Sequence, residues 1–215
     1  LQLAVTLRLH PDRPTISIRD EITNLASVPG GMQLLYHINF GPPLLSAGAE
    51  LFLPVKQMAP RDLEATRDGA AWSRYDAATS GYKERVHFFE LLGNAENQTH
   101  VLLSNAESSR GVSLHYDITQ LPCFAQWKHT GSLKDGYVTG LEPATNFPNP
   151  RSFEADHGRV VPLAPGETRQ FDLCLHYHDH PESVATAQRA IEVLAEGEKP
   201  FVHPQPKADW SFAGS

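Results

Sequence analysis

Residues 1–10 read LQLAVTLRLH, and this stretch gives the clearest indication of the fold. Leucine or valine occupies every odd position, and smaller or polar residues occupy most of the even ones. Alternation of this kind is typical of a β-strand with one buried face. Residues 16–22 repeat the pattern after the turn Pro11-Asp-Arg-Pro14, so we expect the chain to begin with two consecutive strands.

The rest of the sequence continues in the same way. Short apolar or alternating segments run from residue 33 to residue 177, and turn signals such as Gly93-Asn94 and Asp135-Gly136 separate them. Only PESVATAQRAIEVLAE (181–196) has the apolar spacing of a helix, with Pro181 suited to its first turn and Gly197 to its end. Many short strands with one late helix predict an all-β fold, an antiparallel β-sandwich.

The composition restricts the classes of function. Of the 215 residues, 40% are hydrophobic and 20% are charged, and the net charge is −7, which are ordinary values for a globular protein. No run of lysine or arginine and no apolar stretch of about 20 residues is present, so we expect neither nucleic acid nor membrane as a partner. Cys123 and Cys174 do not form a disulfide pattern and indicate reduced thiols in a cytoplasmic protein.

The alternation is already running at Leu1, and the sequence has no initiator methionine. Natural N-termini usually begin with a few loosely held polar residues. We therefore expect that an N-terminal part of the domain is missing from this sequence. In that case a strand edge or an apolar face should be exposed, and a companion N-terminal segment or a homodimer partner would cover it.

Two stretches place an ionisable residue where an apolar strand meets a loop stiffened by proline. In YVTGLEPATNFPN (137–149) Glu142 lies beside Pro143, and in LLYHINFGPPLL (34–45) His37 precedes two prolines. Functional sites of β-folds are often built at such strand ends, because a rigid scaffold holds polar groups toward a cleft. Each residue alone also fits a structural role, a histidine bonded to backbone or a glutamate paired with Arg151. The presence of both stretches favours a site.

The pairing of YHINFGPPLL (36–45) with GLEPATNFPNPRSFEADHGRVVPLAPGE (140–167) resembles the galactose mutarotase (aldose 1-epimerase) superfamily, in particular an uncharacterised mutarotase-like branch. The resemblance covers residues 1–196. It implies a galactose-mutarotase-like β-supersandwich, of which residues 1–198 would be the C-terminal two-thirds, followed by an extended tail at 199–215. In that superfamily a histidine is the general acid, and the glutamate of a Leu-Glu-Pro stretch is the general base. The resemblance therefore implies these roles for His37 and Glu142.

The activity that the resemblance implies is the interconversion of sugar anomers. A base removes the proton of the anomeric hydroxyl while an acid protonates the ring oxygen; the ring opens, rotates about the C1–C2 bond and closes. A carboxylate and an imidazole can share these steps if their pKa values bracket neutral pH. No metal or organic cofactor is required, and the expected partner is a small-molecule sugar. The alternative is a non-catalytic carbohydrate-binding protein of the same fold.

A sugar needs an aromatic platform for its apolar ring face and polar groups for its hydroxyls. Trp127 and Lys128, in LPCFAQWKHTG (121–131), come shortly before the strand of Glu142 and suit these two roles. The structural alternatives are core packing for Trp127 and a solvated charge for Lys128. The further candidates for substrate binding are Asn39, Asn146, Asn149 and Arg151.

A possible metal-ligand group occurs late in the sequence. Cys174, His176, His178 and His180 alternate and therefore share one face of a strand. Neighbours on such a face are about 7 Å apart, which is too far for them to close a zinc shell by themselves. We predict no metal site.

A glycosidase or lyase accessory domain is a further functional alternative. It would require a second carboxylate that faces Glu142 across a cleft. The nearby candidates in the sequence are Glu84, Glu90 and Glu154. The distance from Glu142 to a second carboxylate in the cleft would decide between the two classes of enzyme.

Overall fold

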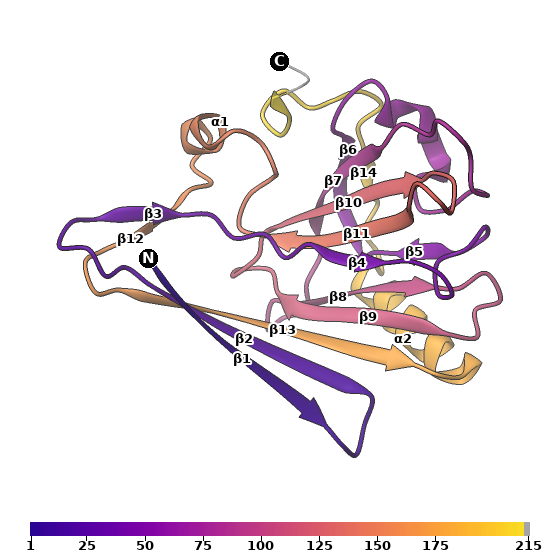
Figure 1. Cartoon of the computed structure of the whole chain (residues 1–215), viewed down its shortest axis with the longest axis horizontal. Helices are drawn as coiled ribbons and strands as arrows, with labels where there is room; N and C mark the ends of the chain where they lie inside the picture. The colour runs from indigo at the N-terminus through magenta and orange to yellow at the C-terminus, as the bar shows by residue number, and fades with distance from the viewer. Residues whose placement is uncertain (213–215) are drawn as a thin grey trace.

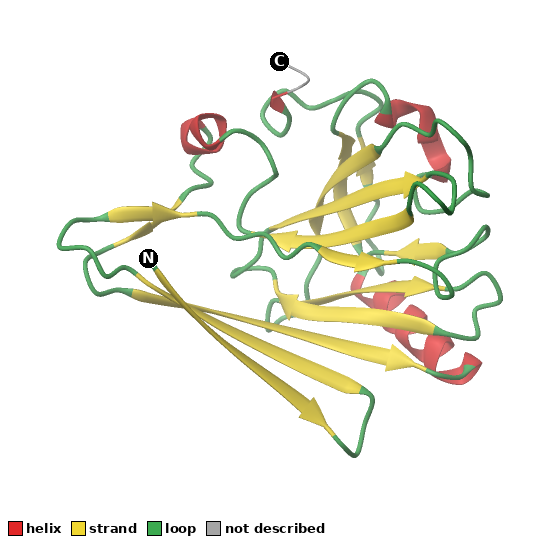
Figure 2. Ribbon diagram, viewed as in Figure 1, coloured by secondary structure: helices red, strands yellow, loops and turns green. Residues whose placement is uncertain are grey.

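A computed structural model describes residues 1–212, and β-strands dominate their regular structure (Figure 2). The strands form two six-stranded sheets that lie one above the other in Figure 1, so the predicted β-sandwich is confirmed. The first sheet consists, in spatial order, of β1 (Gln2–His10), β2 (Thr15–Thr23), β13 (Thr168–His178), β9 (Gly111–Asp117), β8 (Gln98–Ser104) and β5 (Glu50–Phe52). The second sheet consists of β14 (Phe201–Val202), β6 (Val55–Pro60), β7 (Arg85–Leu91), β10 (Cys123–Thr130), β11 (Tyr137–Ala144) and β4 (Ile38–Phe40).

Neighbouring strands pair antiparallel, except that β14 runs parallel to β6. A separate two-stranded sheet is formed by β3 (Gly30–Met32) and β12 (Val161–Leu163). The helical segments are the 3₁₀ helix η1 (Ala65–Ala71), α1 (Arg151–Asp156) and α2 (Pro181–Leu194). None of the helices in residues 1–212 is both long and apolar enough to span a membrane.

The main core lies between the two sheets, on the sides that we call their inner faces. Alternation along the strands supplies it, because every second residue of a strand points to the same face. Leu114 and Leu173 enter this core from the first sheet, and Phe89, Phe124 and Leu141 enter it from the second. The sides that face away from this core are called the outer faces.

The outer face of the second sheet is also packed. Phe88 and Ala125 belong to a second apolar cluster there, together with Phe147 and Trp210. Trp210 is only 3% exposed, and its ring lies 5.0 Å from that of Phe147. The tail predicted to be extended therefore contributes β14 and a buried tryptophan, while its last three residues, 213–215, lie outside the described residues.

The helix predicted at residues 181–196 is confirmed as α2, which ends two residues earlier, at Leu194. Val184, Ala187 and Ile191 are buried against Leu102 of β8, because their spacing places them on one side of the helix. Figure 1 shows α2 beneath the first sheet, on its outer face. The expected domain end at residue 198 falls between α2 and β14.

An apolar strand edge is exposed at one end of the first sheet. β1 pairs with β2 on one side only, and the two strands extend away from the body of the molecule in Figure 1. Leu3, Val5, Leu7 and Leu9 are between 53% and 73% exposed. They lie opposite Ile22, Asp20, Ile18 and Ile16 of β2 and so continue the inner face of this sheet beyond the core. The partner that would cover this edge stays a prediction.

Candidate active site

The two residues assigned to acid–base chemistry meet on the outer face of the second sheet. Leu141 of β11 points into the main core, so its neighbour Glu142 points to the opposite side. Ile38 of β4 lies opposite Leu141, which makes His37 the cross-strand neighbour of Glu142. His37 Nε2 lies 3.1 Å from Glu142 Oε1. Two residues more than a hundred positions apart in the sequence thus form one pair.

The pair combines a buried carboxyl group with an accessible imidazole. The Glu142 side chain is 4% exposed and the His37 side chain is 47% exposed. Gly140 makes room for this contact, because a Cβ atom there would lie 2.7 Å from Glu142 Oε1 and 3.0 Å from His37 Cε1. A glycine inside a strand often marks such a close approach, and this was the signal in the sequence that could have found Gly140.

The surroundings of Glu142 favour its protonated form. Within the described residues no backbone or side-chain donor forms a hydrogen bond to its carboxylate. Burial raises the pKa of Glu142 to about 7, against the opposing effects of His37 and Arg61, and the negative charge of Glu84 raises it further. A carboxyl group of this kind changes its charge near neutral pH, as a general base must.

Trp127 lies next to this pair. It is opposite Gly140 in the register of β10 and β11, and Asn39 is opposite Gly140 on the other side. The Trp127 ring packs edge-on to the His37 imidazole, with ring centroids 5.6 Å apart. Its Nε1–H donates a 2.8 Å hydrogen bond to Glu84 Oε2. Asn39 is exposed, and its side chain forms no hydrogen bond within residues 1–212. His37, Asn39, Trp127 and Glu142 together form the candidate site.

Lys128 does not belong to this group. It follows Trp127 in β10 and therefore points to the inner face, where it is 2% exposed. Its Nζ donates hydrogen bonds to Asp68 Oδ2 at 2.9 Å and to the carbonyls of Trp72 and Arg74. Desolvation lowers the pKa of Lys128, and the Asp68 carboxylate opposes this effect. The predicted contact of Lys128 with a sugar has no support in this geometry.

The side chains of the other three candidates for sugar binding form hydrogen bonds within the protein. Asn146 donates to the carbonyl of Phe147, and its oxygen accepts a hydrogen bond from Thr145. Asn149 donates to Glu154 and to the carbonyl of Trp210. Arg151 begins α1 and donates to the carbonyl of Gly31 in β3. The structure therefore does not bring these three residues into the group around Glu142.

The carboxylates considered as a second catalytic acid all have protein partners. Glu154 is fully buried and accepts hydrogen bonds from Arg159 and Asn149. Glu84 is bound by Trp127 and Arg61. Glu90 lies near Lys56 and accepts a hydrogen bond from Gln57. Glu142 differs from all of them because its carboxylate has no hydrogen-bond donor among the described residues.

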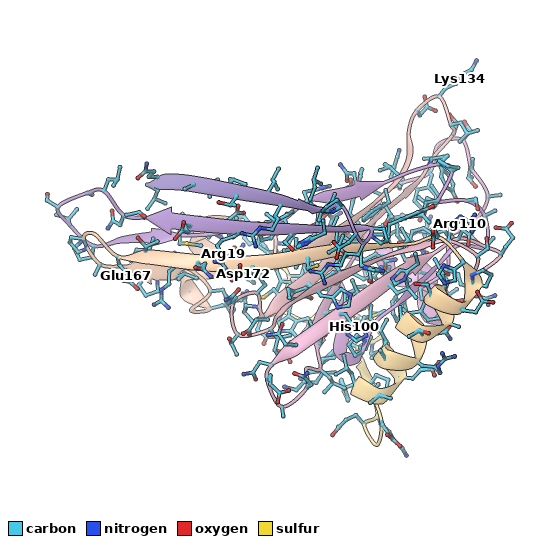
Figure 3. All side chains as sticks on the ribbon, turned by 90° about the horizontal axis from the view of Figure 1, so that it is seen from below. Arg19, His100, Arg110, Lys134, Glu167 and Asp172 are labelled. Atoms are coloured by element: carbon cyan, nitrogen blue, oxygen red, sulfur yellow. The ribbon has the colours of Figure 1, made fainter. Side chains whose placement is uncertain are left out.

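The histidines of β13 lie far from this site, on the outer face of the first sheet. His176 is bonded to Thr15, and Ser113 bridges His178 and His115. Figure 3 views this side of the molecule, with Arg19 and Asp172 side by side and His100 toward α2. Within residues 1–212 no group of three or more His, Cys, Asp or Glu side chains is arranged to hold a metal ion.

Two six-stranded, largely antiparallel sheets packed face to face form a β-sandwich, and similar solved structures place it in the class of galactose-mutarotase-like folds. The model of a family described as Domain of unknown function (DUF4432) matches residues 1–176, and the chain belongs to this family. No curated protein matches the chain.

Solved structures support the same class. The chain matches a crystal structure of a putative aldose 1-epimerase from Klebsiella pneumoniae with a TM-score of 0.93 and 32% identity, over 95% of this chain and 53% of that chain. A putative aldose 1-epimerase from Escherichia coli K12 shares the fold with a TM-score of 0.56 and 12% identity, over 82% of this chain and 60% of that chain. A galactose mutarotase related enzyme from Lactobacillus acidophilus also shares the fold, with a TM-score of 0.58 and 15% identity, over 82% of this chain and 61% of that chain.

The chain thus spans 53% to 61% of the length of these solved proteins. The resemblance to the mutarotase superfamily, inferred from two sequence stretches, is confirmed for the fold. The family match is consistent with the uncharacterised branch of that superfamily.

Proposed function

We propose that the chain carries the acid–base pair of an aldose 1-epimerase-like isomerase, with Glu142 as the base and His37 as the acid. One observation carries the proposal. A nearly buried carboxylate without a hydrogen-bond donor lies 3.1 Å from a half-exposed imidazole, beside an aromatic ring. Structural carboxylates that are buried to this extent normally accept hydrogen bonds from several donors, as Glu154 does from Arg159 and Asn149.

The pair suits the proton transfers of anomer exchange. The carboxylate of Glu142 takes the proton of the anomeric hydroxyl, and protonated His37 gives a proton to the ring oxygen. The bond between C1 and the ring oxygen breaks, and a carbonyl forms at C1. After rotation about C1–C2 the ring closes, His37 regains its proton from the attacking hydroxyl, and Glu142 returns its proton to the carbonyl oxygen. Protons and charges balance over the cycle.

The short distance between the two groups is compatible with this reaction. The anomeric oxygen and the ring oxygen are bonded to the same carbon, so one acid and one base that are close neighbours can reach both. The sugar hydroxyl would replace His37 as the partner of Glu142. Trp127 would support the apolar face of the ring, and Asn39 has amide groups free to bond hydroxyls.

The proposal is tested with the 215-residue chain by NMR exchange spectroscopy on a panel of aldoses. We expect the protein to accelerate anomer exchange of at least one of them. Glu142→Gln and His37→Gln should each lower the rate about 10²- to 10⁴-fold, the usual contribution of a general acid or base. Glu90→Gln, which changes another carboxylate of the second sheet, is the matched control and should keep the rate.

Two outcomes would contradict the proposal. If the sugars bind but the folded wild-type chain accelerates no exchange, the site is that of a non-catalytic carbohydrate-binding protein. If Glu142→Gln exchanges sugars as fast as the wild type, Glu142 is not the base.

A further inference from the structure

We propose that Glu84 is a positioning residue of this site, which together with Arg61 fixes the Trp127 indole against His37. The inference rests on the proposed function, because it assigns to Trp127 the platform on which a sugar would lie. Glu84 directly precedes β7, and Arg61 directly follows β6, the antiparallel neighbour of β7. The two residues therefore meet at one end of adjacent strands.

The contacts form a chain from Arg61 to His37. Glu84 uses both of its oxygens, because Oε2 accepts the indole N–H of Trp127 at 2.8 Å and Oε1 accepts Arg61 Nη2 at 3.1 Å. Arg61 is held in turn by Asp62 at 2.8 Å. The Trp127 ring system packs edge-on to the His37 imidazole. A tryptophan side chain rotates about only two bonds, so one hydrogen bond at Nε1 fixes the plane of its ring.

The imidazole of His129, which lies on the same strand as Trp127, also restricts the orientation of the indole. His129 of β10 is stacked on Trp127 with an interplanar angle of 4° and ring centroids 5.9 Å apart. Gly140, opposite Trp127 on β11, has no side chain that could hold the indole from that side. Glu84 is thus the one hydrogen-bond partner of the indole within the described residues, and its loss would leave the ring free to turn away from His37.

Arg61 and Glu84 also change the pKa of Glu142, in opposite directions. The groups that face Glu142 are His37, Arg61 and Glu84; Arg61 lowers the pKa of the Glu142 carboxyl and Glu84 raises it. The Trp127 hydrogen bond and Arg61 lower the pKa of Glu84, so Glu84 is ionised at neutral pH. Removal of Glu84 should therefore move the Glu142 titration to lower pH, and removal of Arg61 should move it to higher pH.

The experiment observes the indole N–H of Trp127 by ¹⁵N NMR in the full chain, with the resonance assigned by Trp127→Phe. In the wild type we expect slow exchange of this proton with water and a chemical shift that follows the titration of Glu142. Glu84→Ala should speed exchange at least tenfold and lower the titration midpoint. Glu84→Gln keeps an acceptor for the indole but removes the charge, so it should retain slow exchange and still lower the midpoint. Arg61→Met should raise the titration midpoint of Glu142.

Glu90→Ala is the matched control, because Glu90 is a partly exposed carboxylate of β7, the strand that Glu84 precedes, and its partners Lys56 and Gln57 do not include Trp127. Sugar kinetics supply a second readout: Glu84→Ala should raise KM about three- to thirtyfold, the effect of one charge-assisted hydrogen bond, and change kcat less than threefold. Equal indole exchange in Glu84→Ala and wild type, or an unchanged midpoint, overturns the positioning role. Absence of anomer exchange in the wild type overturns the proposed function alone, since the indole measurements need no sugar.

Discussion

Glu142 and Glu154 are both almost completely buried, yet their surroundings differ in kind. Glu154 accepts three hydrogen bonds from Arg159 and Asn149, two residues that also donate to backbone carbonyls of the tail. Glu142 accepts none from the described residues and has only the His37 imidazole at 3.1 Å. Satisfied buried charges stabilise a fold, whereas an unsatisfied one lowers its stability and is available to a ligand. This contrast is the reason why we propose Glu142, rather than Glu154, as the reactive carboxylate.

Gly140 gives a test at the scale of a single residue. In Gly140→Ala the new methyl group would meet Glu142 Oε1 and His37 Cε1 at 2.7 and 3.0 Å, so one of the two side chains must move. We expect anomer exchange to fall at least tenfold while the fold is retained, because misplacement by a fraction of an ångström is costly to acid–base catalysis. Exchange spectroscopy measures the rate, and circular dichroism monitors the fold.

Gly30→Ala is the control for the glycine substitution. A Cβ atom at Gly30 would approach the Asn24 side chain no closer than 3.7 Å, an ordinary contact. This variant should keep the wild-type rate. Full activity in Gly140→Ala would show that the close contact between His37 and Glu142 is not required.

At the scale of the element, β10 shows what could be predicted from the sequence and what could not. The sequence predicts a strand here, and alternation requires Trp127 and Lys128 to point to opposite faces. It does not say which face carries the site, because both faces of the second sheet are packed with apolar side chains. The lysine proved to be the buried residue, which is uncommon for its type. Acceptors that lie far away in the sequence account for its burial: the Asp68 carboxylate on η1 and the carbonyls of Trp72 and Arg74.

The predicted sugar contacts of Asn146 and Asn149 lack support in the structure for a similar reason. Asn146 and Asn149 lie close to Glu142 in the sequence, but the chain turns away after β11, and their amides bond backbone groups of the loop and the tail. The helix α1 has only six residues and no apolar period that a sequence could reveal. The His37–Glu142 pair could be predicted because family motifs mark both residues. The role of Glu84 depends on strand register, which one sequence does not give.

Lys128→Met tests the structural role of this strand position. The change leaves the Asp68 carboxylate, 4% exposed, with Arg85 as its remaining close ionic partner. We expect the free energy of unfolding to fall by about 3 kcal/mol, as is usual when one partner of a buried ion pair is removed. Urea unfolding at pH 7 measures the change.

Lys56→Met is the matched control, because Lys56 is 58% exposed and lies 3.8 Å from Glu90 at the surface. Its removal should change stability by less than about 1 kcal/mol. If Lys128→Met kept its stability but lost affinity for sugar, the result would support the predicted role of Lys128 in sugar binding.

At the scale of the whole molecule, the exposed apolar edge at β1 leads to a prediction about the behaviour of the chain in solution. An exposed strand with unpaired backbone groups and a row of leucines is a site of association. We therefore expect the isolated chain to self-associate with increasing concentration. The double change Leu7→Lys and Leu9→Lys, at positions 65% and 73% exposed, should shift it toward the monomer without loss of stability.

Sedimentation velocity over a hundredfold range of concentration measures this association. Thr6→Lys adds a charge to the opposite face of β1 and is the control, since Thr6 is exposed but does not belong to the apolar row. A wild-type chain that stays monomeric throughout would show that the β1 edge does not drive association. Equal effects of Thr6→Lys and of the double change would show that the apolar row is not the contact.

The proposed function depends on one physical property of the site, namely that the Glu142 carboxyl group changes its charge near neutral pH. The direct measurement is the ¹³C chemical shift of its side-chain carboxyl between pH 4 and pH 9, assigned by comparison with Glu142→Gln. Because burial raises the pKa, the account predicts a midpoint of about 7, with the basic form gaining population as pH rises. A midpoint near the ordinary value of 4.5 would contradict it.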